Sequence, residues 1–132
     1  MSVTVITFGT YDVFHYGHLR ILERAADCGN RLVVGISSDA LNVKKKGVAP
    51  AIPQDQRMAI VKALRCVDAV FIEESLEAKA EYCKHYGANV LVMGDDHDKE
   101  YDEMLQGICN ILYLPRTEGI SSTMIKERIA AP

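Results

Sequence analysis

Short apolar runs alternate along the chain with segments in which apolar side chains recur at helical spacing. Runs rich in Val, Ile and Leu are typical of buried strands, and they cover residues 3–8, 31–36, 69–72, 89–93 and 108–114. Helical spacing occupies residues 17–28, 54–66, 75–86 and 121–129, and a shorter helix could cover 39–43. This order predicts an α/β fold: a doubly wound, five-stranded parallel sheet with helices on both faces. Ligands of such sheets bind beyond the carboxyl ends of the strands.

The composition fits one domain over residues 1–132. Apolar residues make up 48% and charged residues 25% of the chain, as in ordinary globular proteins. The net charge of −3 provides no general attraction for nucleic acid, and no apolar run approaches the roughly 20 residues that cross a bilayer. The first residues lack the pattern of a signal peptide, and the cysteines form no C-x-x-C pair. We therefore expect a cytoplasmic protein that binds no nucleic acid and does not insert into membranes.

The stretch "GTYDVFHYGH", residues 9–18, places two histidines around Gly17 where the first strand leads into the first helix. A helix N-terminus offers free backbone N–H groups to an anion, and Gly17 would let that anion approach closely. His15 and His18 could then donate hydrogen bonds to phosphate oxygens. Two alternatives stay open: one histidine caps the helix while the other packs, or the pair binds a metal, for which no third ligand is obvious.

A second candidate for anion binding is "RTEGISSTMIKERI", residues 116–129. Ser121, Ser122 and Thr123 stand where the last helix should begin, and Arg116 adds a charged donor. Plain capping of the helix by Ser121 is the simpler alternative, although it explains only one hydroxyl. Two such helix starts at one edge of a parallel sheet predict a site for a polyphosphate such as a nucleotide. The long connection 37–53, with consecutive lysines at 44–46, is also expected to be functional.

These two motifs resemble those of the cytidylyltransferase family, whose members carry H-x-G-H and an R-T-E-G-I-S-T-T-like motif. The stretches "RMAIVKALRCVDAV" and "VLVMGDD" also match in type and order. H-x-G-H alone marks a broader nucleotidyltransferase superfamily that includes adenylyl-transferring members, whereas R-T-E-G-I-S favours CTP. In length and pattern the chain is most similar to the short glycerol-3-phosphate cytidylyltransferases.

The resemblance implies a Rossmann-like nucleotidyltransferase fold and transfer of CMP from CTP to a small phosphorylated alcohol. Glycerol 3-phosphate would give CDP-glycerol and pyrophosphate. The resemblance also implies Mg²⁺, bound mainly through the CTP phosphates with no protein metal site, and a homodimer. A non-catalytic, nucleotide-binding regulatory module is the alternative from a different class.

Residue roles follow from the resemblance. It assigns catalysis to His15, His18, Lys44, Lys46 and Arg116. It assigns nucleotide binding to Gly9, Thr10, Tyr11, Asp12, Gly17, Asp95, Thr117, Gly119, Ile120, Ser121, Ser122 and Thr123. It assigns acceptor binding to Lys44, Lys46, Arg57, Arg65 and His97.

Some of these roles have alternatives. Arg57 and Arg65 are separated by a helical rise of about 12 Å, so they cannot hold one phosphate from the same place. Arg57 is better placed for the acceptor's phosphate, and Arg65 could instead interact with the helix C-terminus. Asp12 could orient the motif, reach a metal or form an Asx-turn. His97 stands where the glycerol-phosphate branch typically carries tryptophan, so a different polyol phosphate or a phosphorylated amino compound is an alternative acceptor.

The chemistry of the acceptor predicts how the histidines act. A phosphate monoester has a second pKa of about 6, so it is already a dianion near neutral pH and needs no general base. The barrier is repulsion between the acceptor and the triphosphate. We therefore expect His15 and His18 to donate hydrogen bonds to charge that develops on the α-phosphate, rather than to remove a proton.

Overall fold

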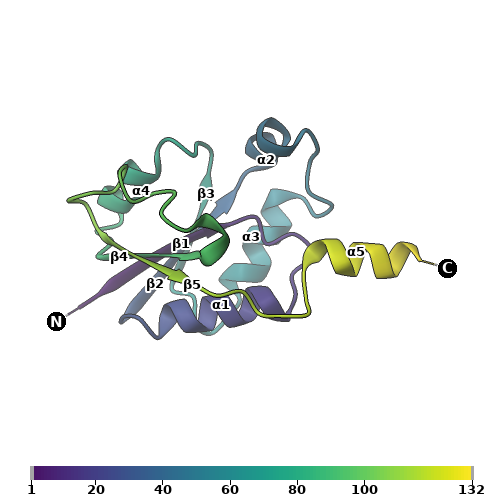
Figure 1. Ribbon diagram of the computed structural model, residues 1–132, viewed down its shortest axis with the longest axis horizontal. Helices are drawn as coiled ribbons and strands as arrows, with labels where there is room; N and C mark the ends of the chain where they lie inside the picture. The colour runs from purple at the N-terminus through teal and green to yellow at the C-terminus, as the bar shows by residue number, and fades with distance from the viewer. Residues whose placement is uncertain (1, 132) are drawn as a thin grey trace.

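The computed structural model describes residues 2–131, and its strands form one parallel sheet in the order β3-β2-β1-β4-β5 (Figure 1). The strands are β1 (Thr4–Gly9), β2 (Arg31–Ser37), β3 (Ala69–Glu73), β4 (Val90–Gly94) and β5 (Asn110–Leu114). The helices are α1 (Tyr16–Ala26), α2 (Asp39–Lys46), α3 (Gln54–Lys62), α4 (Lys79–His85) and α5 (Ser122–Ala130), with a 3₁₀ turn η1 (Asp95–His97). The predicted α/β fold with a five-stranded parallel sheet is confirmed.

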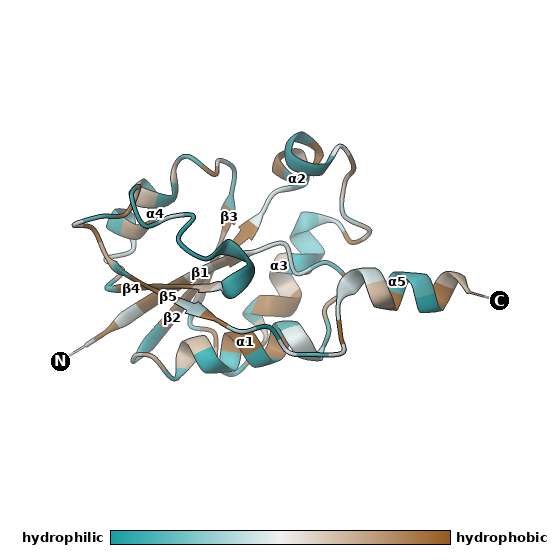
Figure 2. Ribbon diagram, in the orientation of Figure 1, coloured by the Kyte–Doolittle hydropathy of each residue, from teal (hydrophilic) through white to brown (hydrophobic). Residues whose placement is uncertain are grey.

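Two apolar clusters cover the two faces of the sheet, because successive strand residues point to opposite sides. On one face, Val5 and Val34 pack with residues of α1 and α3 such as Leu22 and Val61. On the other face, strand residues such as Ile6 pack with α4 and with the turns that lead into β5. Figure 2 colours the strands mostly brown, as expected for a sheet that is covered on both sides.

Several element boundaries differ from the sequence prediction. The helix expected over 54–66 ends at Lys62, because the following turn folds Leu64 and Cys66 back onto the core. The helix expected over 75–86 begins only at Lys79. The short helix expected over 39–43 extends to Lys46, where Gly47 ends it at φ 78°, a conformation that glycine adopts readily.

A buried ion pair joins the ends of β2, β3 and α4. Lys79 Nζ lies 2.5 Å from Glu73 Oε2, and each residue is only 1% exposed. Ser37 Oγ donates to the other carboxylate oxygen at 3.2 Å, and the ammonium lies 4.5 Å from the centre of the Phe8 ring. Every partner is therefore satisfied, which a buried charge pair requires.

The topology places β1 in the middle of the sheet, between β2 and β4. The strand order changes direction at β1, and this is where ligands of doubly wound sheets bind. Within residues 2–131, no helix has the length and apolar character needed to cross a membrane.

Candidate active site

A cavity of about 430 Å³ opens at the carboxyl ends of β1 and β4. Most of the predicted site residues line it, namely Gly9, Thr10, Tyr11, Asp12, His15, Gly17, His18, Lys46, His97, Arg116, Thr117, Ile120, Ser121, Ser122 and Thr123. The remaining predicted residues lie outside its lining, namely Lys44, Arg57, Arg65, Asp95 and Gly119. The two motifs, which are almost a hundred positions apart in sequence, thus meet around one space.

The two histidines form a reciprocal cap at the start of α1. His15 Nδ1 accepts a hydrogen bond from Gly17 N–H at 3.0 Å, and His18 Nδ1 accepts one from His15 N–H at 3.2 Å. The rings stack with centroids 3.8 Å apart. A Cβ at Gly17 would lie 2.8 Å from the His15 ring, so this arrangement requires glycine. Capping, which the sequence left open for one histidine, applies to both.

This cap determines which ring nitrogen carries the proton. An Nδ1 atom that accepts a hydrogen bond has no proton, so each neutral imidazole carries its proton on Nε2. Burial lowers the pKa of His18 to about 4, with the charges of His15 and Arg116 contributing. Burial, followed by Arg116, also lowers the pKa of His15. At neutral pH both rings are therefore uncharged donors through Nε2–H and poor bases.

The loop before α1 is held in an uncommon backbone conformation. Tyr11 and Val13 have φ angles of 56° and 48°, in the left-handed region that side chains other than glycine rarely adopt. The Tyr11 ring is buried and meets His18 edge-on at 5.4 Å. A Cβ at Gly9 would lie 2.7 Å from this ring, so Gly9 makes room for Tyr11. The strained loop thereby sets the position of His18.

The three hydroxyl residues at the start of α5 have different partners. Ser121 Oγ accepts from Met124 N–H at 3.1 Å and caps the helix, as the simpler alternative predicted. Ser122 Oγ donates to the carbonyl oxygen of Asp12 at 2.7 Å. Thr123 is exposed and lines the cavity. The first-turn N–H groups have no partner within their own helix and can bind an anion.

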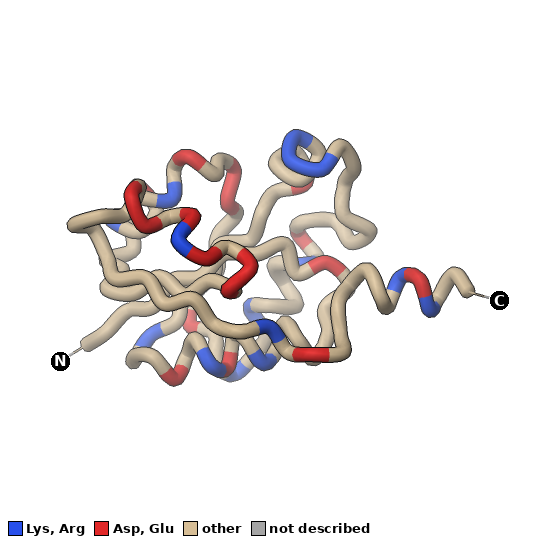
Figure 3. The backbone as a smooth tube through the Cα atoms, in the orientation of Figure 1, with Lys and Arg blue, Asp and Glu red and all other residues tan. Residues whose placement is uncertain are grey.

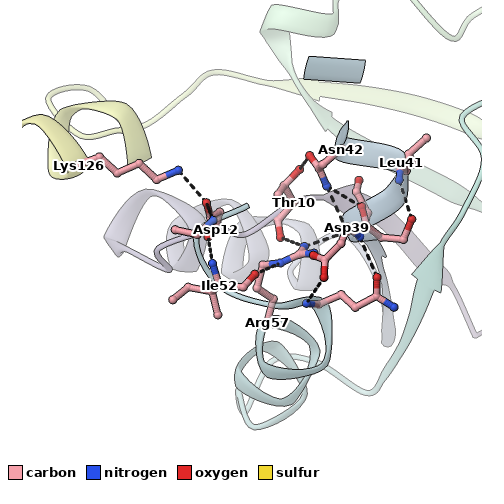
Figure 4. A network of polar contacts seen from close by, with 12 residues as sticks. Thr10, Asp12, Asp39, Leu41, Asn42, Ile52, Arg57 and Lys126 are labelled. Carbon is pink, nitrogen blue, oxygen red and sulfur yellow. Dashed lines mark hydrogen bonds and ion pairs between the residues drawn. The ribbon is translucent and has the colours of Figure 1, made fainter. Parts of the chain in front are cut away.

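Asp12 holds this part of the site together (Figure 4). Its carboxylate accepts hydrogen bonds from the N–H groups of Ala51 and Ile52 at 2.8 and 2.9 Å, and Lys126 Nζ lies 2.7 Å away. Burial alone would raise the pKa of Asp12, but Lys126 and the two N–H groups outweigh it and hold the pKa below its ordinary value. Among the roles left open, orientation of the motif fits these contacts.

Arg57 and Arg65 do not reach the cavity. Arg57 is 1% exposed, and its guanidinium donates to the carbonyl oxygens of Ile52, Thr10 and Ser37 at 2.8, 2.7 and 2.9 Å. A fourth hydrogen bond, of 2.7 Å, goes to Asp39 (Figure 4). The geometry thus favours a structural role for Arg57 over the predicted contact with the acceptor's phosphate. Arg65 lies exposed in the turn after α3, because that helix ends before reaching it.

The lysines of α2 point in different directions, although Figure 3 shows them as one blue stretch. Leu41 and Asn42 are the buried residues of α2, and a helix turns about 100° per residue, so Lys45 shares their face. Desolvation and the charge of Lys46 lower the pKa of Lys45. Lys46 lines the cavity, as predicted, whereas Lys44 lies on the outer side and is not part of the lining.

A third group of charges surrounds η1. Arg116 Nη1 lies 3.9 Å from Asp96 Oδ2, and it is Asp96 rather than the predicted Asp95 that lines the cavity. His97 Nδ1 lies 2.6 Å from Glu100 Oε2. A carboxylate only accepts, so Nδ1 donates this hydrogen bond, and Nε2 lies 3.7 Å from Asp96 Oδ2.

Asn42 and Lys126 line the cavity but were not among the predicted residues. Asn42 accepts from Thr10 Oγ1 at 3.0 Å and donates to Ser38 O at 2.9 Å, which connects α2 to the loop after β1. Its spacing of four residues from the helix cap Ser38 was a usable signal. Lys126 has the same spacing from Ser122, but nothing in the sequence indicated its contact with Asp12.

Within residues 2–131, no group of three or more histidine, cysteine, aspartate and glutamate side chains is arranged to hold a metal ion. The site is instead rich in donors: two imidazoles, a helix N-terminus, two lysines and an arginine. Such a donor set suits phosphate groups and any cation that accompanies them.

Comparison with known proteins agrees with this chemistry. The family model described as cytidylyltransferase-like matches residues 6–128. The glycerol-3-phosphate cytidylyltransferase of Bacillus subtilis (strain 168) is 44% identical over 96% of this chain and 96% of its own length. The protein of that name from Staphylococcus aureus (strain NCTC 8325 / PS 47) is 40% identical over 95% of this chain and 93% of its own.

A solved structure shares the fold at much lower identity. The lipopolysaccharide core biosynthesis protein from Thermoplasma volcanium GSS1 superposes with a TM-score of 0.79 and 19% identity, covering 89% of this chain and 100% of that one. The paired histidines, the donor-rich cavity and the family match over nearly the whole chain lead to one conclusion: this protein belongs to the cytidylyltransferase-like family.

Proposed function

We propose that this protein transfers the cytidylyl group of CTP to glycerol 3-phosphate and releases pyrophosphate. The observation that carries the proposal is the pair of neutral, Nε2-protonated imidazoles in a cavity with Arg116 and the N-terminus of α5. The names of the relatives in B. subtilis and S. aureus support this choice of nucleotide and acceptor.

The reaction needs charge stabilisation more than proton transfer. An oxygen of the acceptor's phosphate forms a bond to the α-phosphorus of CTP, and the bond between that phosphorus and the bridging oxygen to the β-phosphate breaks. The acceptor is already ionised, so no proton has to be removed. Repulsion between unit charges at 4 Å is about 4 kcal/mol at an effective dielectric of 20. His15, His18 and Arg116 offset such repulsion by donating to phosphate oxygens as negative charge accumulates.

Mg²⁺ fits this site as a companion of the nucleotide. Asp12 is the carboxylate of the histidine motif, but its two oxygens already accept from Ala51, Ile52 and Lys126. The phosphates themselves would thus be the principal ligands, and the ion would neutralise charge on the departing pyrophosphate.

His97 is the residue that we expect to contact the alcohol part of the acceptor. It lines the cavity, and its Nε2 can accept a hydrogen bond from a hydroxyl or an ammonium group. This preference suits the hydroxyls of glycerol 3-phosphate and also keeps a phosphorylated amino compound as the second candidate.

The decisive experiment measures pyrophosphate release with each nucleoside triphosphate and a panel of phosphorylated acceptors. We expect CTP with glycerol 3-phosphate to give the highest kcat/KM. Equal rates with ATP would contradict the nucleotide assignment. A hundredfold preference for another acceptor, about 2.7 kcal/mol of transition-state binding, would contradict glycerol 3-phosphate while leaving the reaction class intact. CTP binding without turnover on any acceptor would instead favour a regulatory module.

We also propose that the enzyme is a homodimer and that it is located in the cytoplasm. Light scattering after size exclusion tests the oligomeric state directly. A mass equal to the 14.6 kDa chain at micromolar concentration would contradict the dimer.

A further inference from the structure

We propose that Lys126 is a positioning residue for the nucleotide: it acts through Asp12 to hold the N-terminal turn of α5 against the histidine loop. The inference rests on the proposed function, because the ligand that this turn helps to bind is the triphosphate of CTP.

Asp12 connects three separate segments that border the cavity. Its carboxylate accepts from the N–H groups of Ala51 and Ile52, in the loop before α3, and pairs with Lys126 of α5 at 2.7 Å. Its backbone carbonyl accepts from Ser122 Oγ, also at 2.7 Å. Figure 4 shows Lys126 extending from α5 toward Asp12 while Ile52 approaches from below.

The helix α5 has little else to hold it. None of its residues is buried, and Ile129 is 77% exposed. In Figure 1, α5 projects away from the sheet, whereas α1 and α3 lie along it. A helix without a buried face gains little from packing, so its orientation depends on its two contacts with Asp12.

The orientation of α5 matters because its first turn belongs to the cavity. Ser121, Ser122 and Thr123 all line it, together with His15 and His18. A phosphate can contact both the imidazoles and the helix N–H groups only if α5 stays in this place.

Lys126 also lines the cavity, so direct contact with a phosphate is the competing role. The geometry points to the indirect role. The ammonium already pairs with a carboxylate whose side chain is 8% exposed, and the pair together carries no net charge. A lysine whose role was to bind phosphate directly would be weakened by this carboxylate, because the pair neutralises the charge that attracts the phosphate.

The test compares Lys126→Met, which keeps the length of the side chain without its charge, with Lys126→Arg and with Arg128→Met. Arg128 provides a matched control, because it lies on the same helix, is exposed and is not part of the cavity lining. CTP affinity is measured by calorimetry, and KM and kcat by pyrophosphate release. We expect Lys126→Met to weaken CTP binding about tenfold, Lys126→Arg to restore most of the loss, and Arg128→Met to change it less than twofold.

A double-mutant cycle with Asp12→Asn separates the indirect role from the direct one. If Lys126 acts through Asp12, Lys126→Met has no further effect on CTP affinity in the Asp12→Asn background. A second tenfold loss in that background would overturn the proposal in favour of direct phosphate binding. Unchanged CTP affinity in Lys126→Met would also overturn it.

Hydrogen exchange provides a readout that does not depend on activity. In the free protein, Lys126→Met should lower protection of the α5 amides while α1 and the strands keep theirs, and Arg128→Met should not. Equal protection of the α5 amides in Lys126→Met and Arg128→Met would contradict the proposal that Lys126 holds α5 in place. Wild-type protein that fails to bind CTP would refute the proposed function, and the exchange comparison would still test the link to Asp12.

Discussion

Acidification should destabilise this protein measurably through His18 alone. The pKa of His18 falls from 6.5 to about 4 in the folded protein, chiefly because the ring is buried. Between these values the unfolded chain binds a proton that the folded chain does not, so stability decreases as the pH falls. At pH 5 the linkage amounts to about 2 kcal/mol of lost unfolding free energy relative to pH 7.5. This is a substantial part of the 5–15 kcal/mol that typically stabilises a domain.

The assay is urea denaturation of the wild type and of His18→Asn at pH 7.5, 6 and 5. Asparagine retains a side-chain acceptor for the His15 N–H but does not titrate in this range. Both proteins lose stability in acid through other groups, so the difference between their unfolding free energies isolates His18. We expect this difference to move by about 2 kcal/mol in favour of the variant on going to pH 5.

Parallel stability curves for the two proteins would refute the reasoning. So would an NMR titration that placed the pKa of the folded-state His18 ring near 6.5. Either result would mean that the ring is hydrated rather than desolvated, and about a quarter of the His18 rings would then carry a second proton at pH 7.

Other predictions concern catalysis and the fold. His15→Ala should lower kcat by roughly 10²–10³ with a smaller effect on CTP binding, and His15→Gln should recover part of it through its amide donor; rescue by a base instead of an amide would indicate proton abstraction. Lys46→Ala should raise the KM for the acceptor more than Lys44→Ala, because Lys46 lines the cavity and Lys44 does not, and steady-state kinetics in which the two variants behave alike would contradict this. Arg57→Met should lower the unfolding free energy by about 3–5 kcal/mol, since it leaves three carbonyl oxygens without their donor; a urea midpoint within error of the wild type would rule this out.

The fold was predictable because its signals are local and repeated. Each strand is a short apolar run, and each helix carries an apolar stripe, so alternation alone indicated the sheet. Boundaries were less predictable. Leu64 and Cys66 continue the helical spacing of α3, yet they reach the core through a turn, which only the packed structure reveals.

The parts of the site that lie at the starts of helices were predictable from the sequence. The histidines around Gly17 and the hydroxyls before α5 could be placed at helix starts from spacing alone, and both are there. The surroundings of Arg57 could not be predicted, because its burial and pairing depend on the nearby carbonyl group of Ile52 and on those of Thr10 and Ser37, which are distant in sequence. The sequence around Arg57 did not indicate that its guanidinium is buried in the protein interior.

The buried pair of Glu73 and Lys79 restricts how this sequence can change over generations. Losing either partner alone leaves an unpaired buried charge and lowers the unfolding free energy by about 3–5 kcal/mol. This loss is comparable to the whole stability of a marginally stable domain. A lineage can therefore abandon the pair only by changing both codons together or by first gaining stability elsewhere. For a protein engineer the same barrier is crossed in one step: Glu73→Gln with Lys79→Met removes both charges at once, and such paired replacements are often neutral or stabilising.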